Sequence, residues 1–336
     1  MNNKEELRQI IETLLAKIEA KDQEIGRFLV HDDFEKYDSR IAIWAIRGNI
    51  RDIKETAVTD LTDFPNIEVK ITYAPSSFFL DVLSGRINVP YWQVATVARI
   101  LQHNDIIYDP KGIIQEWVDQ VQNIEWQPEV IDLKKKTTLV LLDRMKNCLK
   151  EEMLADAYIW LLKAAEEAIC IPLMEINAFN IGTATLMLDT LRSADKDLHR
   201  FFSKLLNVSS FNTDRLKKAR EELEILADHI YTKNIKTDRE MWVLAAFVSI
   251  NESERRLKQN LEAQKANEDP NLIQRLFETA IGELWQAFFL VAQNPKLDVK
   301  LDPWVVGSFW KWFGSPEIDE KWLYNQEKEI LNIIGK

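Results

Sequence analysis

The hydrophobic pattern of this 336-residue chain changes near residue 124, and this change limits the folds that it can adopt. Before that point, four short apolar runs have the length and the β-branched content of strands. These runs are residues 26–30, 41–46, 67–73 and 105–109. From Pro128 onward, apolar residues recur at helical spacing and no strand-like run follows. The sequence therefore predicts an α+β fold, with a small mixed sheet and helices in residues 1–127 and an all-helical domain in residues 128–336.

Further signals place individual helices. Residues 1–22 are amphipathic, and the stretches 76–83 and 90–101 lie between predicted strands, the second with proline in its first turn. In the C-terminal half, three polar groups stand before long amphipathic runs, as helix N-caps do. They are Asn212-Thr213-Asp214, Thr237-Asp238 and Asp269-Pro270. Each of them predicts that a helix begins at that point.

The composition excludes several classes of protein. A net charge of −11 repels phosphate backbones, so general nucleic-acid binding is disfavoured. The run Lys134–Lys136 is interpreted as a solvated helix start. The two cysteines, Cys148 and Cys170, both fall in helical segments, which excludes a disulfide framework and a cysteine zinc site and fits a cytoplasmic protein. No window approaches the ~20 consecutive apolar residues that a membrane-spanning helix needs, so no membrane association is expected.

Two segments of the first domain carry a family resemblance. In residues 106–112 (IIYDPKG) a predicted strand ends in Asp-Pro and a new helix starts, and residues 71–85 (ITYAPSSFFLDVLSG) follow the third predicted strand. With the order of strands and polar loops over residues 20–120, they resemble small nucleotidyltransferases of the DNA polymerase β superfamily, particularly those joined to a helical-bundle domain. In that family, a Gly-Ser pair after the first strand seats the triphosphate. A Ser-Asp-hydrophobic-Asp motif on the second strand, with a later third acid, holds Mg²⁺.

The motifs that define the family are altered in this chain. His31-Asp32 stands where the Gly-Ser pair would be, and Ser39-Arg40-Ile41-Ala42 stands where the two carboxylates of the second strand would be. The resemblance therefore implies a remnant pocket. Its candidate residues are His31, Asp32, Asp33, Ser39, Arg40 and Glu68. Glu68 on the third strand is in the place of the third acid, although a surface glutamate explains it equally well.

The altered motifs change the chemistry that the resemblance implies. Arg40 brings a fixed positive charge to the first metal-ligand position, and Ala42 removes two oxygen ligands from the second. Strand alternation puts both on one face, so we expect Arg40 to point into the former pocket and to pair with Asp32, Asp33 or Glu68. We expect no metal, no cofactor and no efficient nucleotide transfer. The first hypothesis is a nucleotidyltransferase-like pseudoenzyme that acts as a non-catalytic binding or regulatory protein.

Two alternatives remain open. The first is an active nucleotidyltransferase that uses displaced carboxylates such as Asp32, Asp33 and Glu68, and it would require Mg²⁺ and ATP. The second is an RNA-cleaving or RNA-binding helical bundle, because Arg192 and His199 resemble the arginine, short spacer and histidine of helical-bundle ribonucleases. In those enzymes the histidine supplies acid–base chemistry and the arginine stabilises phosphate charge. The net acidity of the chain opposes this second alternative.

Large aromatic residues gather near the C-terminus of the chain. A helical core packed with aromatic rings explains them, and an exposed partner site is the alternative. We predict that the helical domain mediates self-association or protein binding through this cluster. The cluster consists of Trp304, Phe309, Trp310, Trp312 and Phe313.

Overall fold

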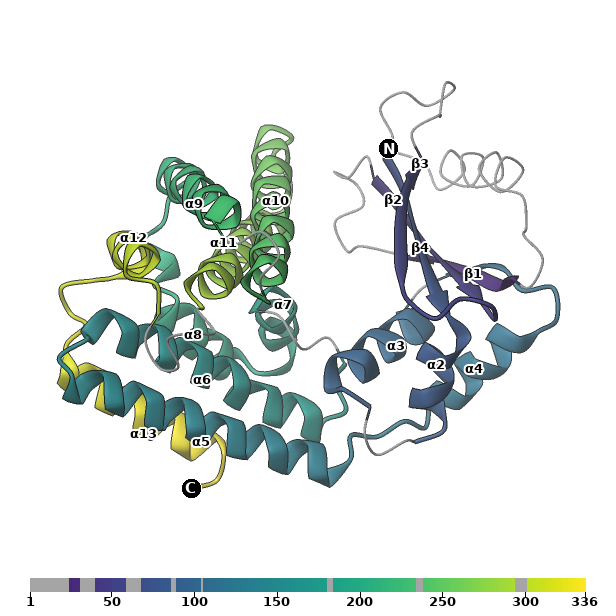
Figure 1. Cartoon of the computed structure of the whole chain (residues 1–336), viewed down its shortest axis with the longest axis horizontal. Helices are drawn as coiled ribbons and strands as arrows, with labels where there is room; N and C mark the ends of the chain where they lie inside the picture. Colours follow the sequence, from purple (N-terminus) through teal and green to yellow (C-terminus); the bar gives the residue numbers. More distant parts are fainter. Residues whose placement is uncertain are drawn as a thin grey trace. The chain divides into compact units, whose positions relative to one another are not determined.

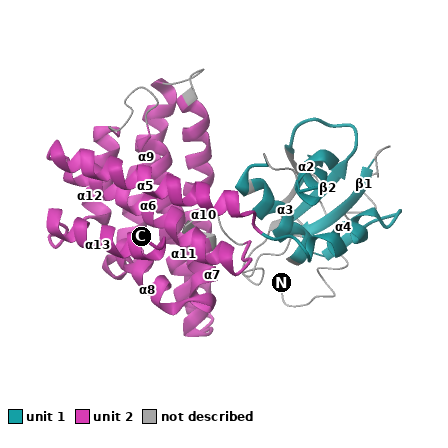
Figure 2. Ribbon diagram, turned by 90° about the horizontal axis from the view of Figure 1, so that it is seen from below, with its two compact units in different colours: residues 1–125 teal, residues 126–336 magenta. Residues whose placement is uncertain are grey.

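The chain folds into two compact units, which are Met1–Glu125 and Trp126–Lys336 (Figure 2). The sequence predicts this division just before Pro128. The predicted helix of residues 1–22 lies outside the part of the chain that the computed structural model describes. The described residues are 24–30, 40–58, 68–85, 89–103, 105–179, 184–233, 238–293 and 301–336.

The first unit contains a five-stranded mixed sheet in the order β3-β4-β2-β1-β5 (Figure 1). The strands are β1 (Glu24–Val30), β2 (Arg40–Arg47), β3 (Lys54–Val58), β4 (Glu68–Pro75) and β5 (Asp105–Tyr108). Strands β2 and β4 are parallel, and the other neighbours are antiparallel. The predicted α+β class is confirmed. Strand β3 was not predicted, because its sequence KETAV lacks the apolar run that identified the other four.

Three helices cover one face of this sheet (Figure 1). They are α2 (Ser76–Leu83), α3 (Tyr91–His103) and α4 (Ile113–Val121). Phe79 of α2 is fully buried and lies at the centre of an aromatic cluster. Its ring stacks on Phe28 of β1 at 6.3 Å and on Trp117 of α4 at 5.6 Å, and it meets Trp44 of β2 edge-on at 6.4 Å. These rings fix α2 and α4 against the sheet.

The connection from β5 to α4 follows the sequence prediction for residues 106–112. The strand ends at Tyr108, and the Asp109 carboxylate then accepts a hydrogen bond of 3.0 Å from the backbone N–H of Gln115 in the first turn of α4. Gly112 precedes the helix with a φ of 70°, a left-handed conformation that favours glycine. The Asp-Pro segment therefore follows the end of β5 and stabilises the start of α4.

The described residues of the second unit are helical throughout, as predicted, and contain no strand. The helices begin with α5 (Pro128–Lys150), α6 (Leu154–Glu175), α7 (Ala184–Ala194) and α8 (Lys196–Leu205), and a short 3₁₀ turn, η2 (Val208–Ser210), follows. The remaining helices are α9 (Thr213–Lys233), α10 (Asp238–Lys265), α11 (Pro270–Ala292), α12 (Pro303–Phe313) and α13 (Glu320–Ile333). Side chains of Asn212 and Asp269 accept backbone hydrogen bonds at the starts of α9 and α11, as their sequence signals predicted. None of the helices in the described ranges combines the length and apolar content that a bilayer crossing requires.

Aromatic side chains fill much of the core of the second unit. Tyr158 of α6, Trp285 of α11 and Phe309 of α12 are completely buried, and Phe309 packs against both of the other two rings. Phe313 is also completely buried, whereas Trp304 is 80% exposed. A partner-binding surface on the C-terminal cluster can therefore not include Phe309 or Phe313, because these rings are packed inside the chain. Self-association itself stays a prediction.

A buried ionic network joins α5 to α6 and corrects the interpretation of Lys134. This side chain is buried rather than solvated, and its ammonium binds the Glu167 carboxylate. Lys163 adds contacts of 2.6 Å to Glu166 and 3.1 Å to Glu167. Burial alone would raise the pKa of Glu167, but Lys163 and Lys134 outweigh it and hold that pKa below its usual value. The local sequence does not show this ion pair, because Glu167 lies 33 residues after Lys134.

Candidate functional site

The resemblance assigns a remnant pocket to one end of the sheet, and four strands begin or end there. Strands β2 and β4 both start there, with Arg40 in register with Glu68. Strand β1 ends there, and β5 starts there with Asp105 in register with Leu29 of β1. Glu68 and Asp105 therefore lie at the same end of the sheet, on strands separated by β2 and β1. The side chains of Arg40 and Glu68, and the residues His31, Asp32, Asp33 and Ser39, lie outside what the structure describes.

Strand β2 contains no aspartate or glutamate at any of its positions from Arg40 to Arg47. Ile43 and Ala45 are buried on one face of the sheet. Ala42 and Trp44 share the opposite face by alternation, and the Trp44 ring packs against Phe78 of α2 at 6.0 Å. Helix α2 therefore covers the middle of the face to which alternation assigns Arg40. Any pocket on that face is confined to the first residues of the strand, and the orientation of Arg40 stays a prediction.

The second pair of residues singled out in the sequence, Arg192 and His199, does come together. Arg192 lies in the last turn of α7 and His199 in the first turns of α8, and the two helices are joined by one residue, Asp195. The Asp195 carboxylate accepts hydrogen bonds from two backbone N–H groups of α8 and caps that helix. Arg192 donates to Oε2 of Glu278 in α11, and Nε2 of His199 lies 3.0 Å from the same oxygen.

Glu278 is the residue of this cluster that the sequence analysis missed. Its side chain is buried, and Oε1 accepts a hydrogen bond of 2.9 Å from Gln274, one turn earlier on α11. Burial would raise the pKa of Glu278, but His199 and Arg192 outweigh it and hold that pKa below its usual value. A glutamate within the apolar stretch of residues 270–292 was a signal of a buried ion pair. Both carboxylate oxygens of Glu278 are occupied, so the cluster is an internal ion pair that joins α7 and α8 to α11.

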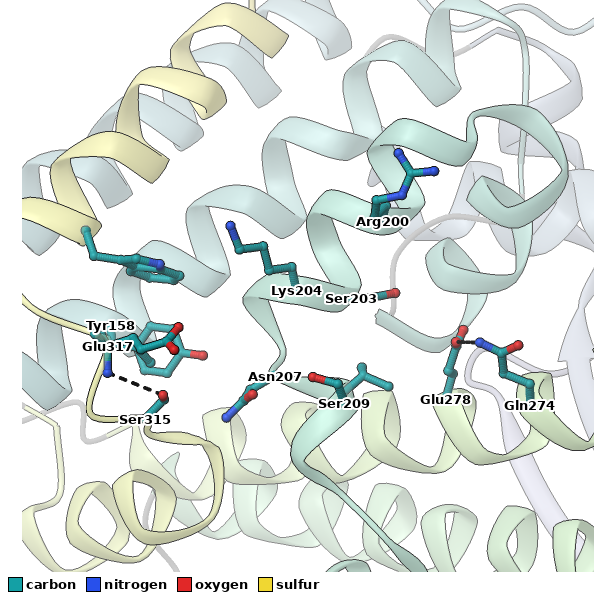
Figure 3. Close-up of a pocket in the computed structure, with 13 residues that line it drawn as sticks. Tyr158, Arg200, Ser203, Lys204, Asn207, Ser209, Gln274, Glu278, Ser315 and Glu317 are labelled. Carbon is teal, nitrogen blue, oxygen red and sulfur yellow. Dashed lines mark hydrogen bonds between the residues drawn. The ribbon is translucent and has the colours of Figure 1, made fainter.

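A cavity of about 490 Å³, lined by polar and apolar groups in similar proportion, lies beside Glu278 within the second unit (Figure 3). Side chains from α6, α8, α11, α13 and the segments around residues 207–209 and 315–318 line it. The lining residues that bear on its chemistry are Arg200, Ser203, Lys204, Glu278, Glu317 and Trp322. Its volume lies within the range of about 300–1,000 Å³ that is typical of small-molecule sites.

A metal site does not emerge from the described part of the chain. There, no three histidine, cysteine, aspartate or glutamate side chains gather closely enough to hold a metal ion. Neither Cys148 nor Cys170 forms a disulfide, both are buried, and burial raises the pKa of the Cys170 thiol to about 12. Neither thiol is poised as a nucleophile or a ligand.

Comparison with solved structures shows a distant likeness. No protein-family model matches the chain, and no curated protein matches its sequence. Among solved structures, the chain is similar to a nucleotidyltransferase-like protein from Exiguobacterium sibiricum 255-15, at 13% sequence identity and a TM-score of 0.40. The match covers 60% of this chain and 67% of that chain. A likeness of this size assigns no activity.

Proposed function

We propose that this chain is a non-catalytic binding or regulatory protein, with a first unit that resembles a nucleotidyltransferase without its metal ligands. The observation that carries the proposal is the composition of β2, which offers no carboxylate along its whole length. Catalysis in that superfamily needs two carboxylates two residues apart on one strand, because they hold the Mg²⁺ that neutralises the triphosphate. Without them, most of the electrostatic stabilisation of phosphoryl-type transfer is lost.

The register of the sheet supports the same proposal. Arg40 begins β2 directly beside Glu68 at the start of β4. A guanidinium repels a divalent cation and prefers a carboxylate or a phosphate, so an ion pair between these residues is the simplest occupant of the former metal position. If the position stays open, it should take an anion without a metal ion. The two buried cysteines form no disulfide, which favours a reducing compartment, and we infer a cytoplasmic location.

The test is titration of the full chain with ATP in the presence and absence of Mg²⁺ or Mn²⁺, followed by an assay of transfer from labelled ATP. We expect no turnover, and any ATP binding should be independent of the metal. Turnover that needs Mg²⁺ and disappears in Asp32→Ala or Glu68→Ala would establish the active alternative and overturn the proposal. Glu116→Ala is the matched control, since this glutamate is exposed on α4 in the same unit.

The contacts of Arg192 and His199 oppose the RNA-cleaving alternative. Arg192 and His199 both bind the buried carboxylate of Glu278, which neutralises the positive charge that a phosphate would need. The geometry favours a structural role for this pair. The cavity beside Glu278 is a separate feature with its own chemistry.

A further inference from the structure

The cavity beside Glu278 is bordered by a row of positive charges on α8. Lys196, Arg200 and Lys204 follow one another at intervals of four residues, so they share one face of the helix, and all three are exposed. Arg200 and Lys204 line the cavity, and Lys196 does not (Figure 3). The chain therefore presents a local cationic wall despite its net charge of −11.

Several hydrogen-bond donors of this cavity have no partner in the described part of the chain. The hydroxyl oxygen of Ser203 is buried and has no hydrogen-bond partner there. Within the same part, the Lys204 ammonium has no ion-pair partner and the indole N–H of Trp322 has no bound acceptor. Among the described residues, the ion-pair partner of Arg200 is the exposed Asp197, at 2.9 Å, and such surface pairs are weak. A ligand that supplies acceptor oxygens would satisfy these donors.

The acceptors around the cavity are, by contrast, largely occupied. Both oxygens of Glu278 already accept hydrogen bonds, and the carboxylate is neutralised by Arg192. At the C-terminal end of α8, the Leu205 carbonyl accepts from the hydroxyl of Tyr158, and the Lys204 carbonyl accepts from the backbone N–H of Asn207 at 3.0 Å. The negative end of the α8 dipole is therefore satisfied internally. Among the described residues that line the cavity, the exposed Glu317 is the carboxylate without an ion-pair partner, and water and salt screen its charge.

We propose that this cavity binds a nucleoside monophosphate. The phosphate contacts Lys204, Arg200 and the Ser203 hydroxyl, because these are the cations and the buried donor that lack strong partners. The cavity is larger than an inorganic phosphate needs, and the indole of Trp322 lines it, so a base has an aromatic ring on which to stack. Glu317 offers acceptor oxygens to hydroxyl or amino groups of the ligand. This site belongs to the second unit alone and does not depend on the sheet of the first.

The test is calorimetric titration of the full chain with adenosine monophosphate, ribose 5-phosphate and inorganic phosphate. Adenosine monophosphate should bind most tightly of the three, and binding should weaken as salt is added. Lys204→Gln should weaken it about tenfold or more, as the loss of one charge-assisted hydrogen bond does. Lys196→Gln is the matched control, because it removes an equally exposed lysine from the same face of α8 without touching the cavity, and it should leave the affinity unchanged.

Three outcomes would overturn the proposal. The first is the absence of adenosine monophosphate binding at millimolar concentration. The second is equal affinity for ribose 5-phosphate, which would remove the base from the recognition. The third is binding that Lys204→Gln and Arg200→Gln leave intact, which would place the nucleotide elsewhere, for example at the sheet end of the first unit. Circular dichroism of each variant checks that the helices are retained, since both side chains are exposed and contribute little to packing.

Discussion

Glu278 is the shared acceptor of a buried polar cluster in the second unit. It is buried, and it accepts hydrogen bonds from Arg192, His199 and Gln274. Glu278→Gln removes the negative charge and leaves Arg192 without its counter-ion, so we expect a loss of about 2–3 kcal/mol in the free energy of unfolding. Urea denaturation at pH 7 measures it. The exposed Glu262→Gln on α10 serves as the control and should change stability by less than about 0.5 kcal/mol.

The same substitution has a defined pH dependence. The folded-state pKa of Glu278 lies below the ordinary value of 4.5, so its stabilisation is fully present above pH 4.5 and is lost as the pH falls through the lower folded-state value. The difference in stability between the wild type and Glu278→Gln should therefore shrink in acid. A difference that persists unchanged at pH 3 would show that the carboxylate acts through packing and not through its charge.

At the scale of single elements, Gly26 controls how β1 meets its neighbours. A Cβ at this position would collide with the Tyr108 carbonyl oxygen of β5 and with the Ile114 side chain of α4. Gly26→Ala should therefore destabilise the first unit by about 1–3 kcal/mol, as overpacking does. Gly307→Ala on α12 is the matched control, because nothing lies within 4 Å of its added Cβ. An exposed helical position of that kind should gain about 0.5–1 kcal/mol. Equal effects of the two substitutions on thermal unfolding would contradict this account of Gly26.

The same elements explain what sequence reasoning could reach. Apolar runs and N-cap residues predicted four of the five strands and the starts of α9 and α11, because those signals are local. Strand β3 could not be predicted, because KETAV has no apolar run and its strand depends on pairing with β4. The spacing of Arg192 and His199 was visible in the sequence, but Glu278, which holds them, comes 79 residues after His199. Arg200, Ser203 and Lys204 follow one another on α8, but the other walls of the cavity come from α6, α11 and α13, so the sequence of α8 alone does not show that these side chains line a cavity.

At the scale of the whole molecule, Trp304 is the large aromatic residue that an association surface would use. It is 80% exposed at the start of α12, beside a shallow hollow lined by Leu226 and Gly307. If the second unit self-associates through this surface, Trp304→Ala should weaken the dimer by about 2 kcal/mol, the size of an interface hot spot. Light scattering over a concentration series measures it, with the exposed Val140→Ala on α5 as the control. A monomer at every concentration would remove the basis for this prediction.

The burial of both cysteines has a consequence for how the molecule responds to oxidants. Oxidation, nitrosylation and glutathione attachment all begin with an accessible thiolate. Cys148 and Cys170 are enclosed by helices, and the high pKa of Cys170 keeps it protonated at physiological pH. Hydrogen peroxide that modifies the sensor cysteines of other proteins should leave both sulfur atoms unaltered. We therefore expect the folded state of this chain to be unaffected by cysteine oxidation when its surroundings become more oxidising.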